Sequence, residues 1–251
     1  MEFLEFKKEL EYIFEKNSLS ELLTEERAQK LYDLTQIMLE VNKSMNLTAI
    51  TDKKAIILKH YADSLTVSKY IPNGVHVIDV GCGAGFPSLP LAIARPDLKI
   101  TALDSTEKRI RYVTETAEML GLTNVDAVAA RAEEYANRTD KREKYDYATA
   151  RAVASLPILC ELTIPFIKVG GTLVAMKAKG ANDEFEMSRS AIRQLAGAES
   201  LANTILIEKT LSGSINGEIV TENRTVVVMN KLASTHKRFP RKFAQIKKNP
   251  L

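Results

Sequence analysis

Tryptophan is absent from the 251-residue chain, and cysteine occurs only at Cys82 and Cys160. Two cysteines so far apart offer neither a disulfide framework nor the four ligands of a structural zinc site, so we interpret both as free thiols and expect no metal. The sequence also lacks an uncharged apolar run of about 18 residues and an amino terminus of the secretory type. We therefore expect a soluble, monomeric, cytoplasmic protein.

Acidic residues are missing from the end of the chain. Residues 231–251 hold seven Lys or Arg and no acid, whereas residues 1–30 hold eight Glu against five Lys or Arg. The net charge of +3 is mild, so the asymmetry is the informative feature. It is typical of nucleic-acid-binding proteins, although a basic terminus is also common as a solvated tail.

The chain divides into a helical segment, an alternating segment and the basic tail. Apolar residues at helical spacing predict helices around 3–14 and 24–41, then a polar stretch at 46–52 and a helical stretch at 59–65. Strands are predicted at 75–80, 99–103, 125–129, 145–149, 172–176, 204–209 and 225–230. Helices are predicted between them at 87–95, 106–120, near 132, 156–167 and 182–195.

Repeated strand-helix units predict an α/β fold with a mostly parallel sheet, covered on both faces, whose ligands bind at the carboxyl ends of the strands. The last two strands, joined by a turn at 212–217, predict an antiparallel hairpin. We expect a helical cap (1–72), an α/β domain (73–232) and a basic tail (233–251).

A glycine-rich turn, Gly81-x-Gly83-x-Gly85, follows the first predicted strand. Such a turn lets a ligand lie against bare backbone beside a helix N-terminus. The dinucleotide fingerprint needs glycine where this chain has Phe86. With Asp79 in front, the pattern instead resembles that of class I methyltransferases, which bind S-adenosylmethionine (SAM). In that resemblance Asp79 serves the amino group of SAM and the loop amides its carboxylate. A glycine-rich turn without a ligand is the alternative.

Polar residues follow the next predicted strands. Asp104 ends the second strand about 20 residues after the glycine turn, where a carboxylate can accept both ribose hydroxyls; capping the next helix is a compatible alternative. Ala132 and Glu133 follow the third strand, where methyltransferases recognise adenine, although a solvated helix start has the same composition. Arg151 follows the fourth strand, where the methyl group and its acceptor should meet, and Lys177 adds a second cation after the fifth.

The sequence contains no convincing catalytic base or nucleophile. Cys160 lies in an apolar helical pattern that predicts a core position. His60 and Asp63, one helical turn apart, could be an acid-base pair, but a structural hydrogen bond is more typical of an isolated pair. With Asn46 and Ser64, they could instead form a wall of the substrate pocket. We assign no catalytic residue.

The motifs together resemble one family over nearly the whole chain, the small-subunit ribosomal RNA methyltransferase G proteins, also called glucose-inhibited division protein B. The segments that carry the likeness are 45–50, 60–65, 79–87, 102–105, 131–133, 150–154 and 239–242. The resemblance implies a class I SAM-dependent methyltransferase fold and 7-methylguanosine in 16S ribosomal RNA as the product. By position, it implies that Gly81, Phe86, Ala132, Glu133 and Arg151 contact SAM, with Asp104 at the ribose.

This implied reaction fits the missing base, because guanine N7 has a lone pair and no proton to remove. N7 lies in a deep, narrow groove of duplex RNA, so the target guanine should be unpaired or flipped out. Arg151 and Lys177 would hold the carboxylate of SAM and an RNA phosphate. We also expect the tail, with Arg241 and Lys242, to lie on the domain and contact rRNA phosphates, so that its removal weakens RNA binding and leaves SAM binding unchanged.

Two alternatives belong to other classes. An NAD-dependent oxidoreductase would share Asp104, but Phe86 breaks its fingerprint, and the one Tyr-x-x-x-Lys, Tyr12 to Lys16, precedes the glycine turn. A protein that binds SAM and regulates without catalysis is compatible with every motif. An assay with labelled SAM separates these from a methyltransferase that acts on 16S rRNA or the small ribosomal subunit.

Overall fold

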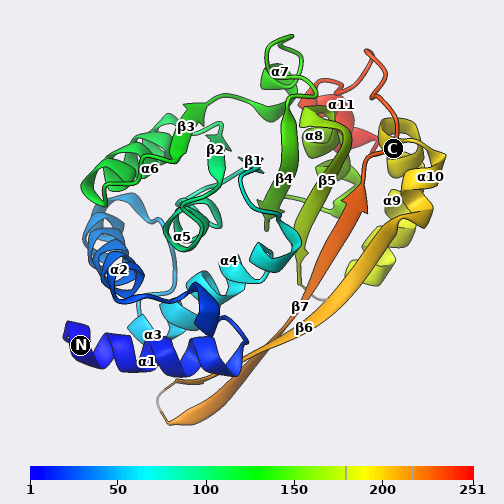
Figure 1. Cartoon of the computed structure of the whole chain (residues 1–251). Coiled ribbons are helices and arrows are strands. Elements are labelled where there is room, and N and C mark those ends of the chain that lie inside the picture. The colour runs from blue at the N-terminus through cyan, green and yellow to red at the C-terminus, as the bar shows by residue number, and fades with distance from the viewer. Residues whose placement is uncertain (179, 216) are drawn as a thin grey trace.

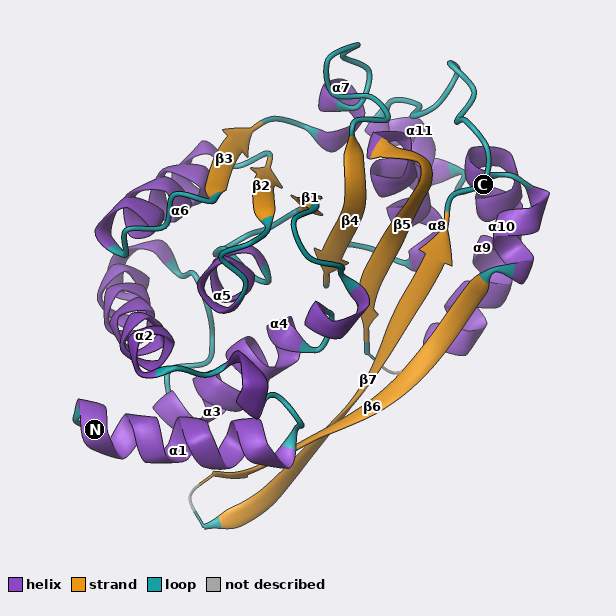
Figure 2. Cartoon of the chain, in the orientation of Figure 1, coloured by secondary structure: helices purple, strands orange, loops and turns teal. Residues whose placement is uncertain are grey.

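The computed structural model describes residues 1–178, 180–215 and 217–251. Within these ranges, seven strands form one sheet in the order β3-β2-β1-β4-β5-β7-β6, with helices on both faces (Figures 1 and 2). The strands are β1 His76–Val80, β2 Lys99–Asp104, β3 Val125–Ala129, β4 Tyr145–Arg151, β5 Ile167–Lys177, β6 Thr204–Ile215 and β7 Glu218–Asn230. The predicted mostly parallel seven-stranded sheet is confirmed.

Strand β1 lies at the centre and pairs in parallel with β2 on one side and β4 on the other. It is buried from Val77 to Val80, as expected for a strand covered on both faces. The connections run in opposite directions from β1, and in such a sheet the crevice beyond the carboxyl ends of the central strands is the usual ligand site. The fold therefore directs attention to the ends of β1, β2, β3 and β4.

Two hydrophobic layers enclose the sheet. One contains buried residues of α1, α2, α5 and α6, and the other contains buried residues of α7, α8, α9 and α11. The helical elements are α1 Phe3–Lys16, η1 Ser20–Leu22, α2 Glu25–Met45, α3 Lys53–Ile56, η2 Ile57–Ala62, α4 Asp63–Leu65, η3 Ser68–Tyr70, α5 Ser88–Ala94, α6 Glu107–Met119, α7 Ala132–Tyr135, α8 Leu156–Thr163, η4 Ile164–Phe166, α9 Ala181–Ala196, α10 Ala198–Ala202 and α11 Phe243–Lys248. The amino-terminal helices thus share one core with the sheet.

The hairpin β6-β7 is much longer than predicted. Its pairing continues from Thr204 opposite Met229 to Ile215 opposite Glu218, so residues 212–215 of the predicted turn belong to a strand, and Asn216 lies outside the described residues. Asn17, just after α1, explains the extension, because its side chain donates to the Ser212 carbonyl (2.8 Å) and accepts from the Ser212 amide (2.9 Å). A tertiary contact overrides the turn propensity of this polar segment.

Other boundaries also differ from the predictions. Strand β5 begins at Ile167, not at residue 172, and the helical stretch before the sheet is a π-helix, η2, that continues into α4. The basic tail lies on the domain as predicted, with Phe239 and Ile246 buried, but it also forms the short helix α11. These boundaries depend on tertiary packing, which the spacing of apolar residues along the sequence does not reveal.

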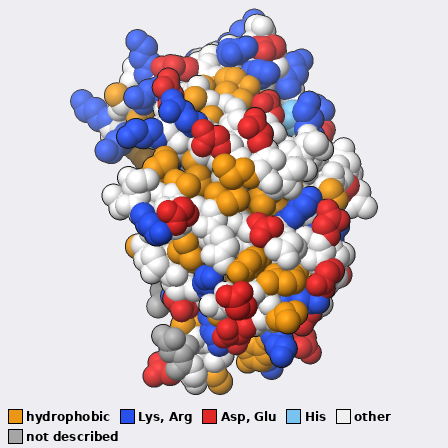
Figure 3. Space-filling model, turned by 90° about the vertical axis from the view of Figure 1, so that its left-hand side faces the viewer, with side chains coloured by type: hydrophobic (Ala, Val, Ile, Leu, Met, Phe, Trp, Pro, Cys, Tyr) orange, Lys and Arg blue, Asp and Glu red, His pale blue; other side chains and the backbone are white. Residues whose placement is uncertain are grey.

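The described residues contain neither a candidate membrane span nor a candidate metal cluster. Among them, no helix combines the length and apolar character needed to cross a bilayer. Nor, in the same part of the chain, do three or more His, Cys, Asp or Glu gather as a metal site would require. Figure 3 shows the face at the left of Figure 1, where acidic and basic side chains are interspersed below and Lys and Arg predominate near the upper end.

Candidate functional site

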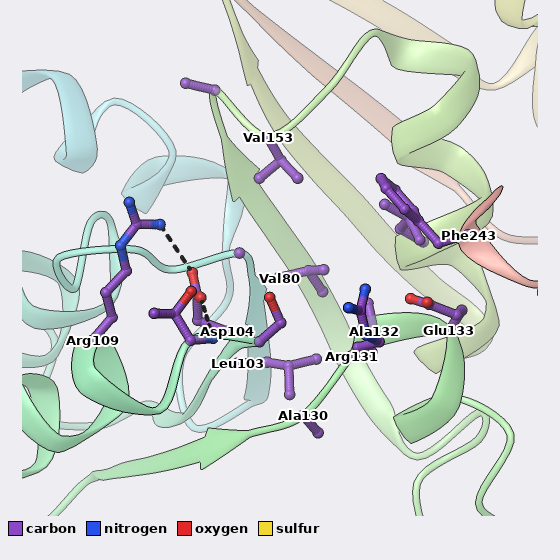
Figure 4. A pocket seen from close by; sticks show the side chains of 15 residues that line it. Val80, Leu103, Asp104, Arg109, Ala130, Arg131, Ala132, Glu133, Val153 and Phe243 are labelled. Carbon is purple, nitrogen blue, oxygen red and sulfur yellow. Dashed lines mark hydrogen bonds and ion pairs between the residues drawn. The ribbon is translucent and has the colours of Figure 1, made fainter. Parts of the chain in front are cut away.

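A cavity of about 320 Å³ lies beyond the ends of β1, β2 and β3 (Figure 4). We call it the strand-end cavity. Its lining combines polar and apolar surface, and Asp104, Arg109, Arg131 and Glu133 bring the charged groups. The lining residues are Val80, Gly81, Leu103, Asp104, Ser105, Thr106, Arg109, Ala130, Arg131, Ala132, Glu133, Ala152, Val153, Leu162 and Phe243. Gly81, Asp104, Ala132 and Glu133, which the sequence predicted to bind cofactor, are therefore brought together.

The glycines of the loop have different roles. Gly83 has φ +56°, and a Cβ built on it would meet no described atom closer than the Gly81 carbonyl oxygen at 4.0 Å. Gly85 has φ +83°, and a Cβ there would lie 2.5 Å from Leu89 of α5. Gly83 therefore leaves space for a ligand, whereas Gly85 allows the loop to pack on its helix. The open space at Gly83 fits the cofactor that the motif predicts.

Five of the loop amides donate hydrogen bonds within the chain. Those of Gly81 and Cys82 donate to the Leu103 carbonyl, that of Gly83 donates to Asp104, and those of Gly85 and Phe86 donate to the Cys82 carbonyl. That the loop amides bind the carboxylate of SAM stays a prediction.

Asp79 is fully buried beneath the loop and is not among the residues that line the strand-end cavity. One carboxylate oxygen accepts from the amide (3.1 Å) and the hydroxyl of Ser88, and the other has no hydrogen-bond partner among the described residues. Burial raises the pKa of Asp79 to about 7, against the opposing effect of the Ser88 hydrogen bonds. A cationic amino group near the free oxygen would favour the ionised form, so Asp79 remains a predicted partner of SAM.

Asp104 lies at the end of β2 with its carboxylate in the cavity. Its Oδ2 accepts from the Gly83 amide at 3.0 Å, and its Oδ1 accepts from the Thr106 amide at 2.8 Å. The second bond closes the turn that leads into α6, whose N-cap residue is Thr106, and Arg109 of that helix lies 3.8 Å from Oδ2. Because each carboxylate oxygen can accept more than one hydrogen bond, Asp104 can connect the two structural elements and still bind a ribose.

A second cavity, of about 540 Å³, adjoins the first and shares Gly81, Arg109 and Ala152 with it. We call it the charged cavity, because five Lys or Arg line it against two carboxylates. Ala152, on the shared wall, has φ +55°, which is unusual for a residue other than glycine and is often found at functional sites. The lining residues are Ile50, Lys59, His60, Asp63, Gly81, Cys82, Gly83, Phe86, Arg109, Arg151, Ala152, Met176, Lys177, Ala178, Glu184 and Arg224.

Asp63 forms ion pairs with two of the arginines that line the charged cavity. It is almost fully buried, with Arg151 Nη1 3.2 Å from one oxygen and Arg224 Nε 2.9 Å from the other. Arg151 also donates to the Lys59 carbonyl at 3.0 Å and lies over the Phe86 ring, 5.0 Å from its centroid. Burial lowers the pKa of Arg151, and Asp63 opposes that effect. The Asp63 carboxylate thus fixes the positions of the Arg151 and Arg224 guanidinium groups in the wall of the charged cavity.

His60 is held neutral. Its ring stacks on Phe86 with centroids 4.5 Å apart, Nδ1 accepts from Arg151 (3.3 Å), and Nε2 lies 2.9 Å from the Thr48 hydroxyl. Burial, with the nearby Arg151 charge, lowers the pKa of His60 to about 3. Both ring nitrogens are engaged, and the imidazole is a poor base at neutral pH. His60 and Asp63 therefore do not form an acid-base pair, because each is bonded to Arg151 instead.

Lys177 is also paired within the chain. Its ammonium donates to the Ala154 carbonyl and contacts Glu184, both at 2.7 Å, and the same Glu184 oxygen accepts from the Leu156 amide at 2.6 Å. These bonds tie the loop after β4 to α9. Lys177 thus fixes the wall of the charged cavity, and its predicted contact with substrate stays a prediction.

The other predicted substrate residues lie elsewhere. Asn46 is exposed at the end of α2 with φ +50°, and Ser64 is fully buried with its hydroxyl unpaired among the described residues. Lys242 is exposed at the start of α11. Arg241 is paired with Glu161, which lies inside the domain. Contacts between these residues and RNA stay predictions.

Several lining residues were missed by the sequence interpretation. Arg109 follows Asp104 by five positions in the next helix, a spacing that could have indicated it. Arg224 lies on β7 and Phe243 in the tail, where no local pattern connects them to the glycine turn. Their places depend on how the sheet and the tail fold, so spacing in the sequence could not reveal them.

Three comparisons place the chain among known proteins. The family model described as GidB, rRNA small subunit methyltransferase G, matches residues 27–210. A ribosomal RNA small subunit methyltransferase G from Leuconostoc citreum is 40% identical, covering 91% of this chain and 93% of that one. One from Halalkalibacterium halodurans is 43% identical, covering 85% and 87%.

Among solved structures, a SAM-dependent O-methyltransferase from Thermotoga maritima has a TM-score of 0.51 at 13% identity, covering 79% of this chain and 73% of that one. At that identity the likeness shows the fold alone, which is the class I SAM-dependent methyltransferase fold. The glycine loop, the strand-end carboxylate Asp104 and the close relatives agree. This chain belongs to the rRNA small subunit methyltransferase G family.

Proposed function

We propose that this chain transfers a methyl group from SAM to N7 of a guanine in 16S rRNA. The observation that carries the proposal is the junction of the two cavities, which share Gly81, Arg109 and Ala152. A cofactor held in the strand-end cavity would present its reacting end to the charged cavity. Membership of the rRNA small subunit methyltransferase G family supports the substrate.

We assign the cofactor contacts by position in the strand-end cavity. Asp104 binds the ribose, and Ala132 and Glu133 contact the adenine. Gly83, which lines the adjoining charged cavity, leaves room for the ligand beside its backbone. When bound, SAM supplies an electrophilic methyl group on a sulfonium. Arg151, beside Phe86 and Asp63, is placed to hold the carboxylate of SAM or an RNA phosphate.

The state of His60 supports N7 as the acceptor. A base with a pKa of about 3, with both nitrogens engaged, cannot remove a proton efficiently at neutral pH. Guanine N7 requires none, because it attacks with a lone pair and carries no proton. The side chains then contribute by orienting the guanine relative to the methyl group of SAM and by excluding water from the site.

Transfer of label from SAM tests the proposal. Purified 16S rRNA and isolated small subunits lacking the modification are incubated with the protein, and the nucleosides are separated. We expect 7-methylguanosine. Label on an exocyclic amine or on cytosine would refute the N7 assignment, whereas SAM binding without transfer to either substrate would favour a regulator.

We expect the protein to act as a monomer in the cytoplasm. Sedimentation with and without SAM tests whether it is a monomer.

A further inference from the structure

The C-terminal tail, residues 233–251, is anchored to α8 by an ion pair. Glu161 of α8 is fully buried, and its carboxylate accepts from the Arg241 guanidinium at 2.6 Å and 2.8 Å. The Arg241 backbone amide also donates to Glu161, at 2.8 Å. A bidentate pair with an additional amide bond fixes both the position and the direction of the chain at this residue.

A second anchor precedes the first. The Arg142 guanidinium donates to the carbonyls of Thr235, His236 and Phe239 at 2.7, 3.2 and 2.8 Å. The Phe239 ring is buried in the same core as Ile246 of α11. The tail is therefore held from before the Phe239-Pro240 bond to the end of α11, which a merely solvated basic segment would not require.

These anchors place Phe243, the first residue of α11, in the wall of the strand-end cavity. Figure 4 shows its side chain beside Glu133, on the side of the cavity away from Arg109. Phe243 remains 37% exposed although neighbouring Ile246 is fully buried. An aromatic ring held at a cavity wall offers an apolar face to a flat ligand.

We propose that Phe243 forms one wall of the adenine subsite and packs against the purine ring of the bound cofactor. The inference rests on the proposed function of the strand-end cavity, in which Ala132 and Glu133 contact adenine. A purine beside Glu133 would meet Phe243 opposite Arg109, and stacking on an aromatic ring stabilises a bound base. The tail thus completes the cofactor site, and the expectation that its removal leaves SAM binding unchanged is replaced.

Calorimetry with S-adenosylhomocysteine, which carries the same adenosyl group and cannot react, tests the proposal. We expect Phe243→Ala to weaken binding by about tenfold and Phe243→Tyr to change it by less than about threefold. Tyr12→Ala, at a similarly exposed aromatic residue of α1, is the matched control and should bind like the wild type. Thermal unfolding of each variant confirms that it is folded.

A second readout uses the absence of tryptophan from the chain. Phe243→Trp introduces a single tryptophan at the proposed wall, which can be excited apart from the tyrosines, and we expect saturating S-adenosylhomocysteine to quench its fluorescence. The same residue placed by Tyr12→Trp should not respond. If the wild type fails to bind the ligand, the proposed cofactor site is wrong. If the wild type binds but Phe243→Ala binds equally well and the Phe243→Trp signal is unchanged, only the role of Phe243 is refuted.

Discussion

The strand-end cavity and the charged cavity differ in how the chain builds them. Most of the first comes from the ends of three successive parallel strands and the turns after them, between Val80 and Glu133. The second brings together residues from Ile50 to Arg224, on elements that meet only in the folded sheet. The strand-end cavity is therefore formed mainly by residues that follow successive strands, whereas the charged cavity depends on contacts between elements distant in the sequence.

They also differ in what satisfies their polar groups. In the strand-end cavity, the Asp104 carboxylate accepts from the backbone amides of Gly83 and Thr106. In the charged cavity, Asp63 is bonded to Arg151 and Arg224, and Lys177 is bonded to Glu184. The carboxylate of the first cavity is thus held by backbone amides, whereas the second cavity is held in position by its own ion pairs. Substitutions in the two should therefore have different effects.

The largest effect is expected at Gly83. Gly83→Val places a branched side chain in the space that we assign to SAM, and we expect affinity to fall at least about a hundredfold. Gly121→Val is the control, because Gly121 has a similar φ of +63° with open space around it and lies outside both cavities. It should lose stability and retain SAM affinity. Equal affinity for both variants, measured by calorimetry on folded protein, would contradict the cofactor assignment.

A second test addresses the ion pairs of the charged cavity. Asp63→Asn removes the buried charge between two guanidinium groups, and we expect the free energy of unfolding to fall by about 3 kcal/mol. Methylation of rRNA should fall sharply and SAM affinity by less than threefold. Asp140→Asn, which breaks an exposed pair with Arg138, should leave all three quantities unchanged. Loss of SAM binding in Asp63→Asn alone would show that the two cavities are energetically inseparable.

This comparison explains what the sequence could predict. Asp104, Ala132 and Glu133 were found because parallel strands repeat the same geometry, so each strand end brings its next residues to one edge. The hairpin β6-β7 was predicted too short, because its extension depends on Asn17, almost 200 residues away. Arg224 was missed for the same reason.

The pairing of the charged side chains could not be predicted from the motifs either. His60, Asp63 and Arg151 were all identified as site residues, but the sequence does not show that each is bonded to another of the three. Arg241 was predicted to contact RNA, whereas its charge lies against the buried Glu161. Sequence spacing indicates which side chains reach a region and does not indicate which of them pair there.

A pH profile measures whether His60 takes part in the chemistry. With saturating SAM under single-turnover conditions, we expect the rate to vary by less than about twofold from pH 6.5 to 8.5. The ordinary pKa of 6.5 describes His60 in the unfolded chain, and burial lowers it to about 3 in the fold. Stability should therefore be unaffected by His60 above pH 6.5 and should decrease as the pH falls towards 3. A rate that rises steeply across the window, and becomes flat in His60→Gln, would identify His60 as a base.

An effect smaller than those at Gly83 and Asp63 is expected from the exposed charges of the tail, which lie outside both cavities. Lys242, Lys247 and Lys248 are exposed on or beside α11, while Arg241 is committed to Glu161. Replacing the three lysines by Gln should weaken rRNA binding several-fold at low salt. It should also flatten the slope of log affinity against log salt by up to about two units, roughly 0.7 for each phosphate that the tail no longer neutralises. SAM affinity should not change, because Phe243 and its anchor are intact. Phe243→Ala should give the reverse result, with an unchanged salt slope and weaker binding of SAM. An unchanged slope in the triple variant would mean that the tail contributes to the cofactor site alone and that RNA phosphates are bound elsewhere.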